Sequence, residues 1–568
     1  MKIYRWQKDI GYDGPVAVGT DETVCVKALR VSGEFVVGSQ GGDVRFESMQ
    51  DLTAKVKDLI EHKKLCSKIR AYTVQVPLPG VPTYVVALLP SNQNETAEDV
   101  CIQHESFLNL AQDAGLKVLS LGSDGAATEM LAQLLLTSKA INYIEFSRPQ
   151  AGIHIKIPLF GSNPTPLVIV QDPKHARKTG ANQLLSGARL LAFGKYYINI
   201  GHMVLLMQDE NSSLYQKDVF NIDRQDDGRA YRSLNNDTLE LALQHPECTG
   251  LAVYLFIIGE LVDAWLSNSA SHEERILSSH TADVFLKRWK AFLKEQYDDT
   301  DGLMSLDRNG ISHPAWKIFS QLASSLVALI ISHREHFPDA PFVPWKHGTE
   351  ACEHIFGWMR VILPKFTMLD ARQMMPKIFT IIRRIMLKRI KMPKSEHIHA
   401  GYNLSFSDEP ASLEQAKLLK IFPSDQRIHS IMALAEKRAQ TLIEFTGMQV
   451  VSRAKPTPSD HQHNPDESHI DEDHSVSVGI TKRYDIVYQE DENDPQLGAS
   501  LHAAASITQE RHNLDCDLDS LDDVTIESVE LNANRMSISS LLNPKADTQV
   551  FQSLMLIDLR RTQPQSWI

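Results

Sequence analysis

The sequence has few cysteines, and they are widely spaced: Cys25, Cys66, Cys101, Cys248, Cys352 and Cys516. No CxxC or CxxH pair occurs, which argues against a structural zinc finger. Isolated cysteines are typical of a reducing compartment, where they are buried as small apolar residues. The cysteine pattern therefore favours an intracellular protein without a disulfide framework.

The sequence also lacks the long apolar runs of secreted and membrane proteins. Its first ten residues, "MKIYRWQKDI", contain no apolar stretch of the kind found in a signal peptide. The most apolar run, Gly250–Leu266, includes Glu260 and Asp263. It is too short and too charged to cross a bilayer, so it predicts a buried helix and no membrane partner. We find no internal repeat.

Negative charge is concentrated at one end of the chain. Residues 451–568 contain 21 acidic and 9 basic residues, which is about −12 of the total of −13. The rest of the chain is nearly neutral and can still bind nucleic acid if its basic residues share one surface. The acidity therefore describes the tail and does not exclude a DNA-binding body.

Apolar, β-branched runs dominate the first 200 residues. Strands are expected at 14–21, 23–31, 34–39, 72–77, 83–90, 116–125 and 165–172. Helical periodicity separates them at about 49–64, 95–114, 126–141 and 173–193. This order predicts an α/β fold in which helices pack on one sheet.

The remainder of the chain shows helical patterns and then loses its apolar content. Residues 200–345 are expected to be helical, and more helices are expected within 349–395 and 411–448. Residues 453–475 contain almost no apolar side chains, which indicates a disordered linker. Beyond it, short apolar segments alternate with acidic ones.

Three acidic residues occupy positions where chemistry is common. Asp21 ends the first expected strand, Asp124 follows a later strand, and Glu353 borders the apolar face of a helix. Residues at strand carboxyl ends converge on one edge of an α/β sheet. Carboxylates brought together need a counterion, and Mg²⁺ with oxygen ligands is the usual one. An alternative from spacing alone is that they are turn formers, helix caps and partners of the helix dipole.

Four segments resemble the DDE transposases with an RNase H-like fold, of the P element and hAT types, and especially transposase-like proteins of fungal genomes. They are "VAVGTDETVCVKALRVSGEFVVGSQGG", "VLSLGSDGAATEM", "VIVQDPKHARKTGANQLLSGARLLAFG" and "GTEACEHIFGWMRVILPKFT". They follow the family's order across about residues 14–395, and residues 200–345 lie where these families insert a helical domain. The resemblance implies an RNase H-like mixed sheet with flanking helices, interrupted by this insertion.

The resemblance also implies roles for individual residues. Asp21, Asp124 and Glu353 take the positions of the catalytic triad that binds Mg²⁺ or Mn²⁺. Gln171 and Asp172 begin a strand–helix motif whose role is structural or DNA-facing. The side chains expected to face DNA are Lys174, His175, Arg177, Lys178, Arg360, Arg383, Arg384 and Lys388. The last three belong to a basic segment, 383–394, which is also compatible with an amphipathic helix and a solvated basic face.

The sequence departs from the family pattern at several positions. Thr128 and Glu129 follow Ala127, so the usual Asn is absent, and "TGANQ" replaces a more basic stretch. No zinc-binding DNA-recognition module precedes Asp21, and no GxxxxGK[ST] motif occurs.

Five parts are expected along the chain. They are the first part of the RNase H-like core at 1–195, a helical insertion at 196–345, the C-terminal part of the core with the final Glu at 346–448, a disordered linker at 449–480, and a mostly disordered acidic tail at 481–568.

Two functions remain open at this stage. The first is a metal-dependent transposase that cleaves and joins DNA, acts in the nucleus and binds transposon ends, with assembly into a homo-oligomer left open. The second is a transposase-derived protein that binds DNA or protein without catalysis.

Overall fold

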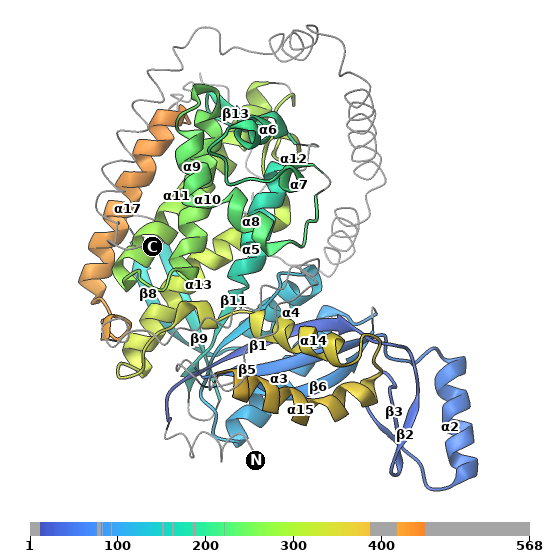
Figure 1. The fold of residues 1–568 in the computed structure, drawn as a ribbon. Helices are drawn as coiled ribbons and strands as arrows, with labels where there is room; N and C mark the ends of the chain where they lie inside the picture. Colours follow the sequence, from blue (N-terminus) through green and yellow to red (C-terminus); the bar gives the residue numbers. More distant parts are fainter. Residues whose placement is uncertain are drawn as a thin grey trace, which may run out of the picture.

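The structure, a computed structural model, describes residues 12–448 except 77–80, 82, 93, 150–152, 162–163, 186–188, 221, 301 and 387–416. The expected linker at 449–480 and tail at 481–568 lie outside the described residues. The described chain has a sheet half and a helical half, joined by the helix α5 (Pro173–Leu184) (Figure 1).

A mixed five-stranded sheet is the centre of the first half. Its order is β11-β7-β1-β5-β6, and the bounds are β1 Val16–Val24, β5 Lys68–Gln75, β6 Tyr84–Ser91, β7 Val118–Ser123 and β11 Val168–Gln171. Strands β1, β5 and β6 pair antiparallel, whereas β7 and β11 run parallel to β1. The fold is the expected RNase H-like α/β arrangement, and the prediction of its class is confirmed.

Helices cover both faces of this sheet. The helices α3 (Ala97–Asp113) and α4 (Ala127–Ser138) cover one face, where they bury Val18, Tyr72 and Leu121. The helices α14 (Glu350–Ile362) and α15 (Met368–Met386) cover the other face. We call these the α3 face and the α14 face. Because side chains alternate along a strand, neighbouring residues of β1 point to opposite faces.

Several small strands complete the sheet half. The β2–β3–β4 sheet and helix α2 form one extension, and β8, β9 and β10 form a second sheet. The bounds are β2 Arg30–Ser32, β3 Phe35–Val37, β4 Val44–Arg45, α2 Met49–Glu61, β8 Asn142–Arg148, β9 Ile153–Phe160 and β10 Thr165–Pro166. The sequence prediction missed β8 and β9, although "IHIKI" alternates as a half-buried strand does.

The helical half packs around the apolar helix α10 (Thr249–Leu266), most of which is buried. Its other elements are β12 Leu191–Phe193, β13 Tyr196–Ile198, α6 Ile200–Gln208, α7 Gln216–Val219, α8 Asp227–Ser233, α9 Asn236–Ala242, η2 Pro246–Cys248, α11 His272–Asp299, α12 Leu306–Asn309, α13 His313–His336 and η3 Pro344–Lys346. Two segments, Pro246–Leu266 and His313–His336, have the length and apolarity of a membrane span, but each is mostly buried in this core. The prediction that Gly250–Leu266 forms a buried helix is confirmed.

The segment expected to complete the core is divided between the halves. The helices α14 and α15 lie on the sheet, whereas α17 (Asp425–Thr446) packs along α11 on the outside of the helical half (Figure 1). Arg148 of β8 also pairs with Glu436 of α17, at 2.5 Å. The chain therefore returns to the helical half after supplying Glu353.

Candidate active site at the carboxyl edge of the sheet

Strand register brings Asp21 and Asp124 together. In the parallel pairing of β1 and β7, Gly19 lies opposite Gly122. Asp21 and Asp124 each follow two residues later, so they lie side by side and on the same face. Asp124 directly follows β7, and its carboxylate accepts the backbone N–H of Ala126 at 3.0 Å in a turn. Asp21 does not end its strand as the sequence predicted, because β1 continues to Val24, but the two acids lie side by side near the carboxyl ends of β1 and β7.

Three glycines allow α14 to approach this edge closely. A Cβ on Gly19 would lie 2.5 Å from the carbonyl oxygen of Gly348, and one on Gly122 would lie 3.0 Å from the Cα of Gly348. A Cβ on Gly348 would lie 2.5 Å from Oδ2 of Asp172. A larger side chain at these positions would require a shift of the Gly348 backbone or of the Asp172 carboxylate. The segment before α14 therefore rests directly on β1 and β7.

Asp172 fastens α14 to the sheet. Its Oδ1 accepts the backbone N–H groups of Lys174 and His175 at 2.8 Å and so caps α5. Its Oδ2 accepts the backbone N–H and the hydroxyl of Thr349, the residue before α14, at 2.6 and 3.1 Å. Although burial opposes ionisation, His175 and these N–H groups lower the pKa of Asp172. Both carboxylate oxygens of Asp172 accept hydrogen bonds from the protein. Of the two roles that the sequence left open for this residue, structural or DNA-facing, the contacts favour the structural one.

Glu353 is held by two side chains of α5. Its Oε1 lies 3.1 Å from Nε2 of His175 and 3.8 Å from Nζ of Lys178. Burial raises the pKa of Glu353, and His175 and Lys178 partly offset this effect. His175 and Lys178 of α5 therefore hold the carboxylate of Glu353 in place.

The electrostatics differ at Asp21. Its Oδ1 accepts the backbone N–H of Glu22 at 2.7 Å, and no basic side chain pairs with it in the part of the chain that the structure describes. Burial raises the pKa of Asp21 well above its ordinary value, and the carboxylates of Asp124, Glu353 and Asp172 raise it further. Negative charge around Asp21 therefore opposes the ionisation of its own carboxyl group.

The donor chemistry at this edge fits a hard divalent cation. Asp21 and Asp124 offer carboxylate oxygens without a cationic partner among the described residues, and Mg²⁺ is held by one or two carboxylates together with substrate phosphates. Within the described ranges no three His, Cys, Asp or Glu side chains already stand at metal-ligand spacing. Glu353 instead points to His175 and Lys178, so a third ligand would have to leave these partners.

Most of the residues predicted to face DNA have partners within the protein. Lys174 pairs with Glu350, Arg177 lies 5.3 Å from the ring centre of Tyr231, and Arg360 donates to the hydroxyl of Thr23. His175 and Lys178 hold Glu353, as described above. In this arrangement the structure gives these five residues internal contacts rather than a free basic surface.

The structure describes only the first part of the basic segment 383–394. Arg383 and Arg384 are exposed near the end of α15. Lys388 lies outside the described residues.

The α3 face contains a network of buried charges that the sequence prediction missed. Arg70 lies 2.8 Å from Glu129 and 2.9 Å from Glu22, and Glu129 also lies 2.6 Å from Nε2 of His104. Although burial opposes ionisation, His104 and Arg70 lower the pKa of Glu129 to about 2. The sequence feature that could have indicated this network is Glu129, which lies in a segment that departs from the family pattern.

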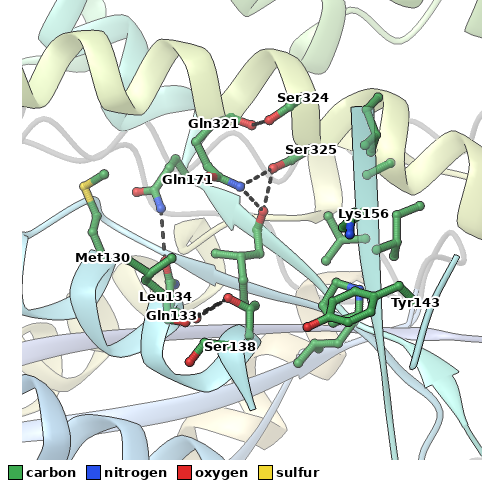
Figure 2. A pocket seen from close by; sticks show the side chains of 18 of the residues that line it. Met130, Gln133, Leu134, Ser138, Tyr143, Lys156, Gln171, Gln321, Ser324 and Ser325 are labelled. Atoms are coloured by element: carbon green, nitrogen blue, oxygen red, sulfur yellow. Dashed lines mark hydrogen bonds between the residues drawn. The ribbon is translucent and has the colours of Figure 1, made fainter. Parts of the chain in front are cut away.

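A pocket of about 450 Å³ lies beside the edge strand β11, between α4, β9 and α13 (Figure 2). Three glutamine amides line it: Gln171 donates to Gln133 at 3.1 Å, and Gln321 reaches Ser325 at 3.0 Å. The hydroxyl of Ser325 donates a hydrogen bond to the backbone carbonyl of Ile169 at 2.6 Å. None of the described residues that line this pocket carries a carboxylate side chain. The polar lining of this pocket therefore differs from the carboxylate site at Asp21 and Asp124.

Comparison with known proteins gives one weak structural similarity. No protein-family model and no curated protein matches the sequence. The solved structure of the Drosophila P element transposase strand transfer complex matches with a TM-score of 0.43 and 14% identity, over 66% of this chain and 77% of that one. At this TM-score the similarity assigns no activity to the chain.

Proposed function

We propose that the protein is a DDE transposase-like enzyme that uses Mg²⁺ or Mn²⁺ to cleave DNA and transfer strands. The observation that supports it is the position of Asp21 and Asp124, which lie side by side on one face of the sheet without a cationic partner among the described residues. Glu353 is near enough on α14 to raise the pKa of Asp21. Three of the four segments that resemble the transposase family carry the same three acids, in the family's order.

Each residue has a distinct part in this proposal. Asp21, Asp124 and Glu353 would bind the metal ions, which would activate water or a 3′-hydroxyl and stabilise the leaving oxygen. Asp172 holds the start of α14 against the sheet through Thr349. His175 orients Glu353 through the 3.1 Å contact with its carboxylate.

The same proposal includes the substrate, the assembly and the cellular location of the protein. DNA is the substrate, and Arg383 and Arg384 remain exposed as candidate phosphate contacts. Assembly into a homo-oligomer on transposon ends and a nuclear location remain predictions.

The decisive test is a DNA nicking and joining assay with Mg²⁺ or Mn²⁺. Asp124→Asn keeps the shape of the side chain but removes its charge, so we expect activity to be abolished while the fold is retained. Asp113→Asn is the matched control, because Asp113 is an exposed acid at the end of α3, and it should retain activity. Equal activity in the wild type and Asp124→Asn would show that the acids are not catalytic. DNA binding without any metal-dependent activity would support the non-catalytic alternative.

A further inference from the structure

Helix α5 touches both halves of the molecule. One side of it supports Glu353 through His175 and Lys178. Its other side packs in the helical half, where the carbonyl of Gly180 accepts the hydroxyl of Tyr254, on α10, at 2.9 Å. Figure 1 shows α5 running from the sheet into the helical half beside α8. A side chain on α5 can therefore connect the two halves directly.

Lys178 makes this connection. Its Nζ lies 3.2 Å from Oδ1 of Asp227, the first residue of α8, and 3.8 Å from Oε1 of Glu353. Only 8% of the lysine side chain is exposed, so water screens these charges weakly. One ammonium group is thus shared between an acid of the helical half and an acid of the proposed active site.

The position of Asp227 relative to Lys178 is fixed by further contacts between α5 and α8. The guanidinium of Arg229 donates to the side-chain oxygen of Asn182 at 2.5 Å. Arg177 lies over the ring of Tyr231. Any movement of α8 against α5 would therefore change the distance from Asp227 to Lys178.

We infer that Lys178 is a positioning residue whose ammonium group is divided between Asp227 and Glu353, so that the helical half sets how firmly Glu353 is held away from divalent ions. This inference rests on the proposed function, because it assigns Glu353 to the metal site. An ammonium that loses one carboxylate partner moves closer to the other, since the attraction rises as the distance falls. The contact between Asp227 and Lys178 therefore weakens the ion pair between Lys178 and Glu353 and favours metal binding by Glu353.

The test is a double-mutant cycle read by Mn²⁺ affinity, with Mn²⁺ alone and no DNA, measured by electron paramagnetic resonance of the free ion. Asp227→Asn should weaken Mn²⁺ binding about fivefold, because Lys178 then pairs with Glu353 alone. Lys178→Met should strengthen binding by a similar factor, because Glu353 then keeps only its contact with His175. In the Lys178→Met background, Asp227→Asn should have no further effect. Asp227 is partly exposed, so its substitution tests the inference even if Lys178→Met does not fold.

A matched charge control comes from the same region. Asp223→Asn removes one negative charge from an exposed residue whose carboxylate accepts the backbone N–H of Gln225, and it should change the Mn²⁺ affinity less than twofold. An Asp227→Asn deficit of the same size in both backgrounds would indicate a through-space effect and overturn the shared lysine. The absence of any Asp227→Asn deficit would also overturn it.

Asp21→Asn separates this inference from the proposed function. If Asp21→Asn binds Mn²⁺ as the wild type does, the proposed metal site is wrong, and the inference fails with it. If Asp21→Asn loses Mn²⁺ binding while the cycle is additive, the metal site stands and only the role of Lys178 is overturned.

Discussion

Two adjacent acids on β1, Asp21 and Glu22, lie on opposite faces of the sheet in opposite electrostatic surroundings. Glu22 on the α3 face meets Arg70 and also accepts the hydroxyl of Ser91 at 2.7 Å. Asp21 on the α14 face has acidic neighbours that raise its pKa. Removing one partner of a buried, paired acid is costly to the fold, whereas an acid surrounded by other carboxylates is poised to bind a cation. The comparison explains why one face holds the sheet together while the other is the candidate active site.

The largest expected effect concerns catalysis by the two neighbours on β1. Asp21→Asn should reduce DNA cleavage at least about 1,000-fold, or about 4 kcal/mol in the activation free energy, because it removes a metal ligand. Glu22→Gln should leave cleavage per folded molecule within about threefold, since Glu22 points to the α3 face. The measurement is single-turnover nicking at saturating Mn²⁺. Equal losses in both variants would remove the functional contrast between the faces.

The next effect concerns stability of the α3 face. Arg70→Met should destabilise the protein by about 3 kcal/mol, because it leaves Glu129 buried without its guanidinium partner and in contact with His104 alone. Urea unfolding measures this change. Asp124→Asn is the control and should change stability by less than about 0.5 kcal/mol, since Asp124 is exposed. A loss below about 1 kcal/mol for Arg70→Met would mean that this network contributes little to the fold.

Acid should weaken the α14 face before the α3 face. Burial lowers the pKa of His347, which contacts Ser120 beneath this face, to about 3. The folded state therefore favours the neutral imidazole, and its stability falls as the pH drops from about 6.5 towards 3, by at most about 1.4 kcal/mol per pH unit. Glu129, with a folded pKa of about 2, contributes stability that is present above about 4.5 and is lost only below that pH.

Variants distinguish these two pH windows. His347→Gln should flatten the dependence of the unfolding free energy between pH 6.5 and 4.5, in part only, because burial also lowers the pKa of His272 and His333. Glu129→Gln should leave the slope in that window unchanged. The same slope in the wild type and His347→Gln would show that this histidine does not limit stability in mild acid.

The smallest expected effect is a gain in stability at the site itself. Without metal at pH 7, Asp21→Asn should stabilise the protein by up to about 1 kcal/mol, because it removes a charge that its neighbours oppose. Glu22→Gln should do the opposite, because it weakens the pair with Arg70. Thermal unfolding in the presence of a chelator measures both. Destabilisation by Asp21→Asn would indicate that Asp21 has a hidden stabilising partner.

Local pattern was enough to determine much of this protein. Alternation and helical periodicity predicted the strands around Asp21 and Asp124, the helix of Glu353 and the buried helix α10, because these signals depend on residues close together in the chain. The pattern failed at β8 and β9. It also did not indicate that α17 returns to the helical half, because a helix pattern does not specify which partner its apolar face meets.

The identity of the three candidate acids came from the sequence, but their surroundings came only from the tertiary structure. Asp172 reaches Thr349 across 177 residues of chain, and His175 and Lys178 meet Glu353 across a similar separation. Strand register placed Asp21 beside Asp124 and turned Glu22 to the other face. Such contacts depend on where distant elements pack, and the charge around a side chain depends on those contacts. For this reason the sequence indicated which residues were acidic, whereas only the fold decided which of them lacked a cationic partner.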